Sequence, residues 1–208
     1  MSSNELTERV LVIASCNAGK IREFTNLLAH LPLEIRPQPA DLNVEETGSS
    51  FAENARIKAS TVAKATGHWA LADDSGLSVN ALNGAPGVHS ARFADSDAAR
   101  ISRLLFELEE AKTTDRSAQF TAALAVADPN GKIQIEVEGE CPGTILAQPR
   151  GDSGFGYDPV FYLPELDQTF AEMQKAVKNQ VGHRGRAFSN LEPQLRQIIN
   201  SSLQSIND

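Results

Sequence analysis

The sequence predicts an α/β protein built around a mixed sheet. Residues 9–14 form a short β-branched run that is typical of a buried strand, and residues 20–31 carry apolar residues at a helical spacing. Farther along, residues 116–127 and 132–138 have strand patterns on either side of the turn signal Asp128-Pro129-Asn130-Gly131, which predicts an antiparallel hairpin. Strands that alternate with helices around an antiparallel middle portion indicate a mixed α/β fold.

The remaining elements of the first half follow from local signals. Residues 33–36 alternate in polarity and predict a second strand, which is broken by the prolines that follow. Ser50-Phe51-Ala52-Glu53 has the capping-box pattern and predicts a long helix to about residue 66, which Gly67 ends. Residues 69–73 and 77–82 then predict two separate strands.

The second half adds three more elements. Residues 97–112 predict a helix with one apolar face, and residues 143–148 predict a further short strand. From His183 to the end the pattern is helical, although Pro193 implies a kink or a restart.

Composition limits the class of protein. With 208 residues, 41% hydrophobic and 22% charged, the chain fits one globular domain, 1–208, with room for two lobes. The net charge of −8 argues against sequence-independent binding to nucleic acid or to an anionic membrane. An acidic protein can still bind a polyphosphate where Lys and Arg cluster locally or a metal screens its carboxylates.

Cellular setting follows from the cysteines and the first residues. Cys16 and Cys141 have no metal-ligand spacing and give no sign of a disulfide framework. The polar start lacks the pattern of a secretory signal, and no run approaches the roughly 20 apolar residues that a membrane span needs. We therefore expect a cytoplasmic protein.

The most informative motif is Ala72-Asp73-Asp74-Ser75-Gly76. Carboxylates that follow a strand and face a cleft are well placed to hold a divalent metal or to take a proton. Because side chains alternate along a strand, Asp73 and Asp74 are expected on opposite faces, so at most one carries the chemistry. The alternative is a turn in which an aspartate caps backbone N–H groups ahead of Gly76.

A second motif, Ser15 to Lys20, connects the first strand to the first helix. Such a loop presents unpaired N–H groups and the positive end of the helix dipole, and Lys20 adds a full charge, which together suit phosphate. The loop is not a Walker A motif, because Ala14 and Ile21 stand where that motif requires Gly and Ser or Thr. The alternative is an ordinary strand-to-helix connection.

A third polar group surrounds the start of the second helix. Glu45 and Glu46 lie in a loop, where oxygen ligands for Mg²⁺ are easily supplied. Glu53 has a simpler explanation as the acid of the capping box. Asn54 and Lys58 lie four residues apart on one helical face, which is either turned toward a substrate or merely solvated.

Two further groups come late in the chain. In the glycine-rich segment that runs from Gly151 to Asp158, Phe155 and Tyr157 could set an aromatic face against a base; the alternative is a tight turn with two core aromatics. Basic residues then gather before and into the last helix, where they oppose the helix dipole. Such a conflict between local rules often marks a functional site, the alternative being a solvated basic face. The basic residues are Lys178, His183, Arg184 and Arg186.

In this order and spacing, the motifs closely resemble the inosine triphosphate pyrophosphatases, also called XTP/dITP diphosphatases. The resemblance spans about residues 10–187 and implies hydrolysis of non-standard purine nucleoside triphosphates (ITP, dITP, XTP) to the monophosphate and pyrophosphate. It also implies an elongated mixed-sheet fold with two lobes flanking a central nucleotide-binding cleft, a Mg²⁺ cofactor and a homodimer. It rests on Ser15 to Lys20, Thr47-Gly48, Phe51 to Ala55, Ala72 to Leu77, Gly84 to Gly87, Ser90-Ala91-Arg92, Gly154 to Pro159 and His183 to Ala187.

The resemblance also implies roles for individual residues. Asp74 would be the catalytic proton acceptor and a Mg²⁺ ligand, with Glu45 as the second metal ligand and Glu46 and Glu53 as alternatives to it. The residues expected to bind the substrate are Ser15, Cys16, Asn17, Ala18, Gly19, Lys20, Ser75, Phe155, Gly156, Tyr157, Asp158, Lys178, His183 and Arg184.

The sequence departs from the family pattern at two positions, and two other functions stay open. Cys16 stands where the family commonly has Gly, and Gly182 stands where a Ser usually precedes His-Arg. The first alternative function is a Maf-like nucleotide pyrophosphatase, which cleaves the same bond but prefers different bases. The second is a non-catalytic regulator that binds the nucleotide without releasing pyrophosphate.

Overall fold

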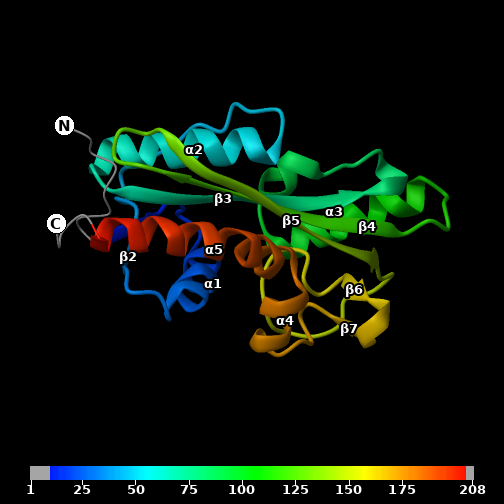
Figure 1. Cartoon of the computed structure of the whole chain (residues 1–208). Coiled ribbons are helices and arrows are strands. Elements are labelled where there is room, and N and C mark those ends of the chain that lie inside the picture. Colours follow the sequence, from blue (N-terminus) through cyan, green and yellow to red (C-terminus); the bar gives the residue numbers. More distant parts are fainter. Residues whose placement is uncertain (1–9, 205–208) are drawn as a thin grey trace. The chain divides into compact units, whose positions relative to one another are not determined.

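A computed structural model describes residues 10–204, which contain one seven-stranded mixed sheet (Figure 1). The strand order is β2-β1-β3-β4-β5-β6-β7. Strand β1 pairs in parallel with β2 and β3, whereas β6 pairs antiparallel with β5 and β7, so the predicted mixed α/β class is confirmed. The strands are β1 (Val10–Ile13), β2 (Glu34–Pro37), β3 (Trp69–Val79), β4 (Ser117–Ala127), β5 (Ile133–Ile145), β6 (Phe161–Leu163) and β7 (Gln168–Thr169).

Five α-helices and three short 3₁₀ helices occur in this part of the chain. From residue 10 to residue 204, none of the helices combines the length and the apolarity needed to cross a membrane. The polar N-terminal segment, the predicted strand start at Arg9 and residues 205–208 lie outside the described residues. The helices are α1 (Ala18–Leu28), α2 (Phe51–Thr66), η1 (Asn80–Leu82), η2 (Gly87–Arg92), α3 (Asp97–Glu110), η3 (Pro164–Leu166), α4 (Lys175–Val181) and α5 (His183–Gln204).

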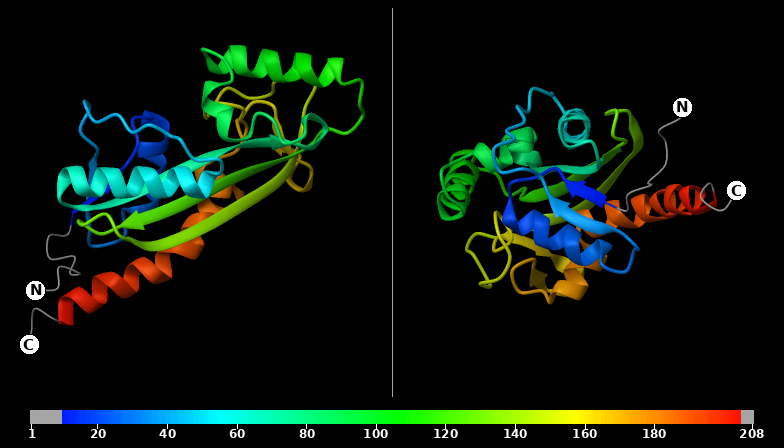
Figure 2. Two further views of the ribbon diagram at one scale, coloured as in Figure 1. Left: turned by 90° about the horizontal axis from the view of Figure 1, so that it is seen from above. Right: turned by 90° about the vertical axis from the view of Figure 1, so that its left-hand side faces the viewer.

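The chain divides into two compact units. Unit 1 comprises residues 1–74, 123–139 and 187–208, and unit 2 comprises residues 75–122 and 140–186. The core of unit 1 is built from small side chains such as Ala59, Ala70 and Ala125, which let helix and sheet approach closely. In this unit, α2 covers one face of the strands and α1 lies on the opposite face (Figures 1 and 2).

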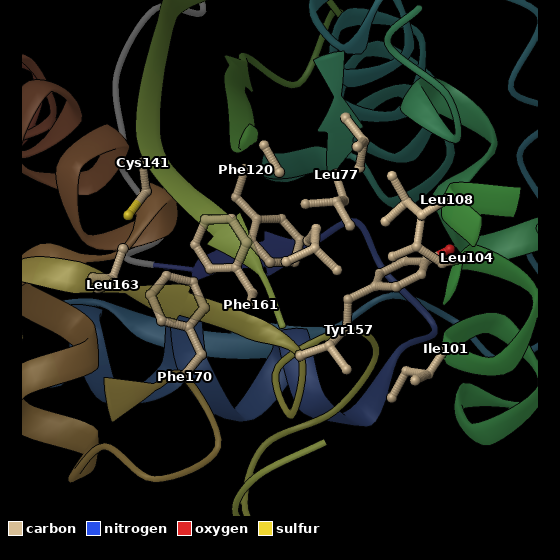
Figure 3. Close-up of a cluster of buried hydrophobic side chains, with 14 of the residues drawn as sticks. Leu77, Ile101, Leu104, Leu108, Phe120, Cys141, Tyr157, Phe161, Leu163 and Phe170 are labelled. Atoms are coloured by element: carbon tan, nitrogen blue, oxygen red, sulfur yellow. The ribbon is translucent and has the colours of Figure 1, made fainter. Parts of the chain in front are cut away.

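The core of unit 2 is aromatic (Figure 3). Phe120 packs edge-on against Phe161 at a centroid distance of 4.7 Å and stacks on Phe170 at 5.7 Å. Leu77 of β3 and Leu104 of α3 are fully buried in the same cluster. Burial of such large rings stabilises the unit and gives a rigid base for its polar residues.

Helix α2 forms where its local signals predict. The Ser50 hydroxyl accepts the Glu53 N–H at 3.2 Å, and Gly67 ends the helix with φ of 68°. That left-handed conformation favours glycine, because a residue with a side chain is strained there. The predicted hairpin also forms, since β4 and β5 are neighbours in the sheet and only a short loop joins them.

The prediction of two strands separated by a turn at Asp73 to Gly76 is wrong. Strand β3 runs without a break from Trp69 to Val79. Asp, Ser and Gly favour turns in isolation, but here the incorporation of β3 into the sheet beside β4 overrides that preference. The two aspartates therefore lie inside a strand, where their side-chain directions are fixed.

Other differences concern short or merged elements. The strand predicted at residues 143–148 is the end of the longer β5, and the predicted restart at Pro193 is wrong because α5 continues through it. A proline removes one backbone hydrogen bond, which the packed turns on either side tolerate. The short elements α4, β6 and β7 were not predicted, because so few residues establish no periodicity.

Candidate functional site

In unit 1, the side chains around Asp74 form a carboxylate–lysine cluster, which consists of Glu46, Asn54, Lys58 and Asp74. The Lys58 ammonium lies 2.8 Å from Asp74 Oδ1 and 2.8 Å from Glu46 Oε1, and it donates to the Asp73 carbonyl at 2.9 Å. The Asn54 amide donates to Asp74 Oδ2 at 3.2 Å. Both oxygens of the Asp74 carboxylate are thus fixed by donors.

Helix α2 supplies two of these side chains from one face. Asn54 and Lys58 are one turn apart and are only 1% and 9% exposed, so the reading of this face as solvated is wrong. The Asn54 carbonyl oxygen accepts the Gly48 N–H at 2.8 Å. A side chain at position 48 would collide with Asn54, so glycine lets the loop approach the helix.

The environment of Asp74 makes it a stronger base than an ordinary aspartate. Burial raises the pKa of the Asp74 carboxyl, although the Lys58 ammonium opposes this effect. Burial by itself lowers the pKa of Lys58, but the carboxylates of Asp74 and Glu46 outweigh it and raise the pKa, so the amine stays charged. A carboxylate tuned in this way is suited to accept a proton.

Asp73 has a different partner from Asp74. Its carboxylate pairs with the Lys20 ammonium of α1 at 2.7 Å, whereas Asp74 is bound by α2. The two aspartates therefore contact helices on opposite faces of the strands, which confirms the predicted alternation (Figure 1). Lys20 is consequently anchored beside the strand that carries Asp74.

The loop from Ser15 to Lys20 is an N-capping structure. Asn17 Oδ1 accepts the N–H groups of Gly19 and Lys20 at 2.8 and 3.2 Å, and Ser15 Oγ accepts the Asn17 N–H at 3.1 Å. The Asn17 oxygen thus bonds the N–H groups that a phosphate would bind at a helix start. Cys16 is exposed, and its sulfur accepts a hydrogen bond from Gln38 at 3.1 Å.

Of the three acids left open as second metal ligand, Glu46 is the one that joins the carboxylate–lysine cluster. Glu45 is exposed. Glu53 accepts the N–H and the hydroxyl of Ser49 at 2.6 and 2.8 Å, as expected of the acid that caps the helix start. The path of the loop that carries Glu45 and Glu46 determines which of the two side chains reaches Lys58, and the sequence does not reveal this path.

In unit 2, residues 154–158 form a glycine–aromatic turn. Gly154 and Gly156 have φ of 83° and 63°, a region that favours glycine. Asp158 Oδ2 accepts the Phe155 N–H at 2.9 Å and also pairs with the Lys178 ammonium at 2.6 Å. Asp158 therefore closes the turn from inside, while Phe155 stays partly exposed.

Two cations lie close to the Phe155 ring. The Lys178 ammonium and the Arg184 guanidinium carbon each lie 5.3 Å from its centroid, within the range of a cation–π contact. Arg184 also donates to the Ser75 hydroxyl at 2.8 Å, which joins residues far apart in the chain. The structure thus brings together five of the predicted substrate-binding residues, which are Ser75, Phe155, Asp158, Lys178 and Arg184. The reading of the basic group as a solvated face is wrong for Lys178 and Arg184.

His183 and Tyr157 lie deeper in unit 2. His183 is 3% exposed and stacks on Phe120 at a centroid distance of 4.6 Å. Tyr157 belongs to the aromatic core (Figure 3), and its hydroxyl donates to the Ser90 carbonyl at 2.9 Å. Burial raises the pKa of Tyr157, which keeps it a neutral donor.

Gly182 departs from the family pattern for a visible reason. A Cβ atom at this position would come within 2.6 Å of the Lys178 carbonyl oxygen, so a serine would require the backbone to shift. The glycine lies between α4 and α5, where its carbonyl accepts the Arg186 N–H at 3.0 Å. The close junction of the two helices depends on it.

Sequence motifs did not single out Asp97, whose Oδ2 accepts the Gly156 N–H at 2.7 Å. In the sequence, an aspartate directly after Ser96 indicates only an acid that stabilises the start of a helix. Its contact lies 59 residues away in the sequence, so no local signal could reveal it.

Comparison with known proteins gives consistent results. A Ham1 family model matches residues 11–194. A dITP/XTP pyrophosphatase of Prochlorococcus marinus (strain MIT 9313) is 63% identical over 199 residues, covering 96% of this chain and 97% of the relative. One from Nostoc sp. (strain PCC 7120) is 52% identical over 196 residues, covering 94% and 99%.

Solved structures similar to this chain belong to the same kind of protein as its sequence relatives. A HAM1 protein from Coxiella burnetii has a TM-score of 0.83 and 44% identity, covering 90% of this chain and 98% of that one. A nucleoside-triphosphatase, dITP/XTP pyrophosphatase, from Mycobacterium abscessus has a TM-score of 0.69 and 40% identity, covering 88% and 99%. The resemblance seen in the sequence motifs is confirmed.

Proposed function

The chain belongs to the Ham1 family, and we propose that it hydrolyses the non-standard purine nucleoside triphosphates dITP, XTP and ITP to the monophosphate and pyrophosphate. The observation that carries this proposal is the buried Asp74 carboxylate, positioned by Asn54 and Lys58. The names of relatives at 52–63% identity support dITP and XTP as substrates.

We assign the reaction at the phosphates to residues of unit 1. Asp74 takes a proton from the water that attacks the α-phosphorus, and its raised pKa suits that role. Lys20 and Lys58 carry the positive charge that orients the triphosphate and stabilises charge on the departing pyrophosphate. Each lysine is already held by an aspartate, so it is positioned before substrate arrives.

The carboxylates of Asp74 and Glu46 fit a Mg²⁺ ion. Both lie 2.8 Å from one ammonium group, so their oxygens converge on a single positive charge. In residues 10–204, no three His, Cys, Asp or Glu side chains gather as a metal site, but Mg²⁺ is commonly held by one or two carboxylates together with substrate phosphates. When bound, Mg²⁺ polarises the phosphate oxygens and neutralises their charge.

We assign recognition of the base to residues of unit 2. Phe155 offers a ring face for stacking, and Arg184 and His183 offer donors for a 6-keto oxygen. The 6-amino group of adenine would leave such donors unpaired, which disfavours ATP. These roles, like those of the Ser15–Lys20 loop, rest on the resemblance and on the contacts described above.

The proposal includes the wider expectations drawn from the sequence. We expect a homodimer, as the family resemblance implies, and a location in the cytoplasm, as two cysteines without a disulfide framework imply. Sedimentation of the purified protein tests the dimer directly.

The reaction is tested by measuring the hydrolysis of ITP by the wild-type protein and by Asp74→Asn. The wild type should release inosine monophosphate and pyrophosphate with Mg²⁺ and stop when a chelator is added. Asp74→Asn keeps the size of the side chain but accepts no proton, so kcat should fall by about a hundredfold to ten-thousandfold. Near-normal turnover of the variant would remove Asp74 from the mechanism, and binding without release by the wild type would favour the regulator.

A further inference from the structure

The glycine–aromatic turn is attached to the rest of unit 2 on several sides. Asp158 bonds the Phe155 N–H, and Tyr157 bonds the Ser90 carbonyl. These two contacts fix the residues before and after Gly156. The peptide of Gly156 itself is held by a separate group, Asp97, the first residue of α3.

The carboxylate of Asp97 is itself oriented by its neighbours. While Oδ2 accepts the Gly156 N–H at 2.7 Å, Oδ1 pairs with the Arg100 guanidinium at 2.6 Å. Arg100 in turn donates to the Ala94 carbonyl at 3.0 Å. The acceptor is therefore fixed in place before it meets the turn.

Packing alone does not hold this side of the turn. A pocket of about 410 Å³ lies here, and Asp97, Ile101, Phe155 and Gly156 are among the residues that line it. Gly156 has no side chain to anchor it. Its φ is 63°, and a glycine can change from this value to a negative φ at little cost. A hydrogen bond beside open space thus fixes the peptide that follows Phe155.

We propose that Asp97 is a positioning residue for base recognition: by holding the Gly156 N–H, it keeps the Phe155 ring in the orientation that stacks on the purine. The inference rests on the proposed function and extends it to a residue outside the recognised motifs. Without this bond the Gly156 peptide can rotate, and binding must then restore the order that the free protein has lost. The loss appears in KM, because Asp97 acts on the Phe155 ring, which is assigned to binding of the base.

The test compares Asp97→Ala with Asp97→Asn and a matched control. In Asp97→Ala the KM for ITP should rise about tenfold while kcat stays within about twofold, as expected for loss of a hydrogen bond to a charged acceptor. Asp97→Asn keeps an acceptor oxygen and should stay within about threefold of the wild-type KM. Ser96→Ala removes only the bond to the Ala99 N–H, so it weakens the start of α3 without touching the turn and should leave KM unchanged.

A double-mutant cycle with Phe155→Ala separates positioning from general destabilisation. Phe155→Ala alone should raise KM by about tenfold, the range of base–aromatic stacking. Asp97→Ala added to Phe155→Ala should then change KM by less than about twofold, because Asp97 acts through the ring. If Asp97→Ala does not fold, Asp97→Ser replaces it, since its hydroxyl is too short to reach Gly156.

The outcomes distinguish this inference from the function on which it rests. If the wild type hydrolyses ITP and Phe155→Ala raises KM, but Asp97→Ala does not, the positioning role is wrong and the function stands. Additive effects in the cycle, or a rise in Asp97→Asn as large as that in Asp97→Ala, also overturn it. If the wild type releases no pyrophosphate from ITP, the proposed function itself fails.

Discussion

Two adjacent aspartates in one strand have separate partners, and this separation assigns them different roles. Asp74 is bound by Lys58 and Asn54 from α2, whereas Asp73 is bound by Lys20 from α1. We infer that Asp74 is the base and that Asp73 is the anchor of a phosphate-binding lysine. A strand interior allows this arrangement because it points neighbouring side chains in opposite directions.

The choice between Glu45 and Glu46 gives a prediction with a built-in control. Glu46→Gln should raise the Mg²⁺ concentration needed for half-maximal activity by about tenfold or more, because a charged oxygen of the carboxylate–lysine cluster is lost. Glu45→Gln makes the same change of charge at an exposed neighbour and should leave that concentration unchanged. Titration of ITP hydrolysis with Mg²⁺ measures both variants, and the reverse order of effects would restore Glu45 as the ligand.

At the scale of elements, the attachment of α5 within unit 1 includes a charged contact that depends on pH. Glu192 of α5 lies 2.7 Å from the His30 imidazole, just beyond α1, and 2.7 Å from Arg196. The hydrogen bond with His30 lowers the pKa of Glu192, and Arg196 adds to this effect. Since the folded-state pKa is depressed, the contact stabilises the protein above the unfolded pKa, and the stabilisation is lost as pH falls through the folded pKa.

Glu192→Gln should therefore lower the Tm by about 1–3 °C at pH 7, the size expected of a surface ion pair. The difference from wild type should shrink as the pH falls below the ordinary range of a glutamate, because the lowered pKa of Glu192 keeps the wild-type carboxylate ionised until then. Thermal unfolding between pH 7 and about pH 3 measures this, with Glu138→Gln, a change at an exposed acid of the same unit, as the control. A difference that stays constant over this pH range would contradict the assigned contact.

The elements that could be predicted from sequence are those with complete local signals. Ser50, Glu53 and Gly67 define both ends of α2 because capping depends on residues a few positions apart. The continuity of β3 through Gly76 could not be predicted, since it depends on pairing with strands distant in sequence. The short elements around β6 lack any period that a pattern could reveal.

The same distinction applies to the candidate site. Its residue types, Lys20, Asp74, Phe155 and Arg184, could be identified from motifs in the sequence. Which side chains meet could not, because contacts such as Arg184 with Ser75 join distant parts of the chain. Asp97 was missed for this reason, since its role exists only once the turn has folded against α3.

At the scale of the whole molecule, the two kinds of chemistry belong to different units of the chain. Unit 1 carries the residues assigned to the phosphates, and unit 2 carries those assigned to the base. The peptide bond between Asp74 and Ser75 links the two sets directly, because β3 contributes to both units. We therefore expect substitutions in unit 1 to act mainly on kcat and metal dependence, and those in unit 2 mainly on the choice of base.

The most direct test of the proposed function is a measurement of kcat/KM for pyrophosphate release from ITP, dITP, XTP, ATP and dTTP with Mg²⁺. We expect the values for the first three to exceed those for ATP and dTTP by more than about a hundredfold. For ATP the reason is that adenine leaves unpaired the donors that bind a 6-keto oxygen. Comparable values for ATP would contradict the proposed recognition of the base, and a preference for dTTP would identify the protein as a pyrophosphatase of the Maf-like kind.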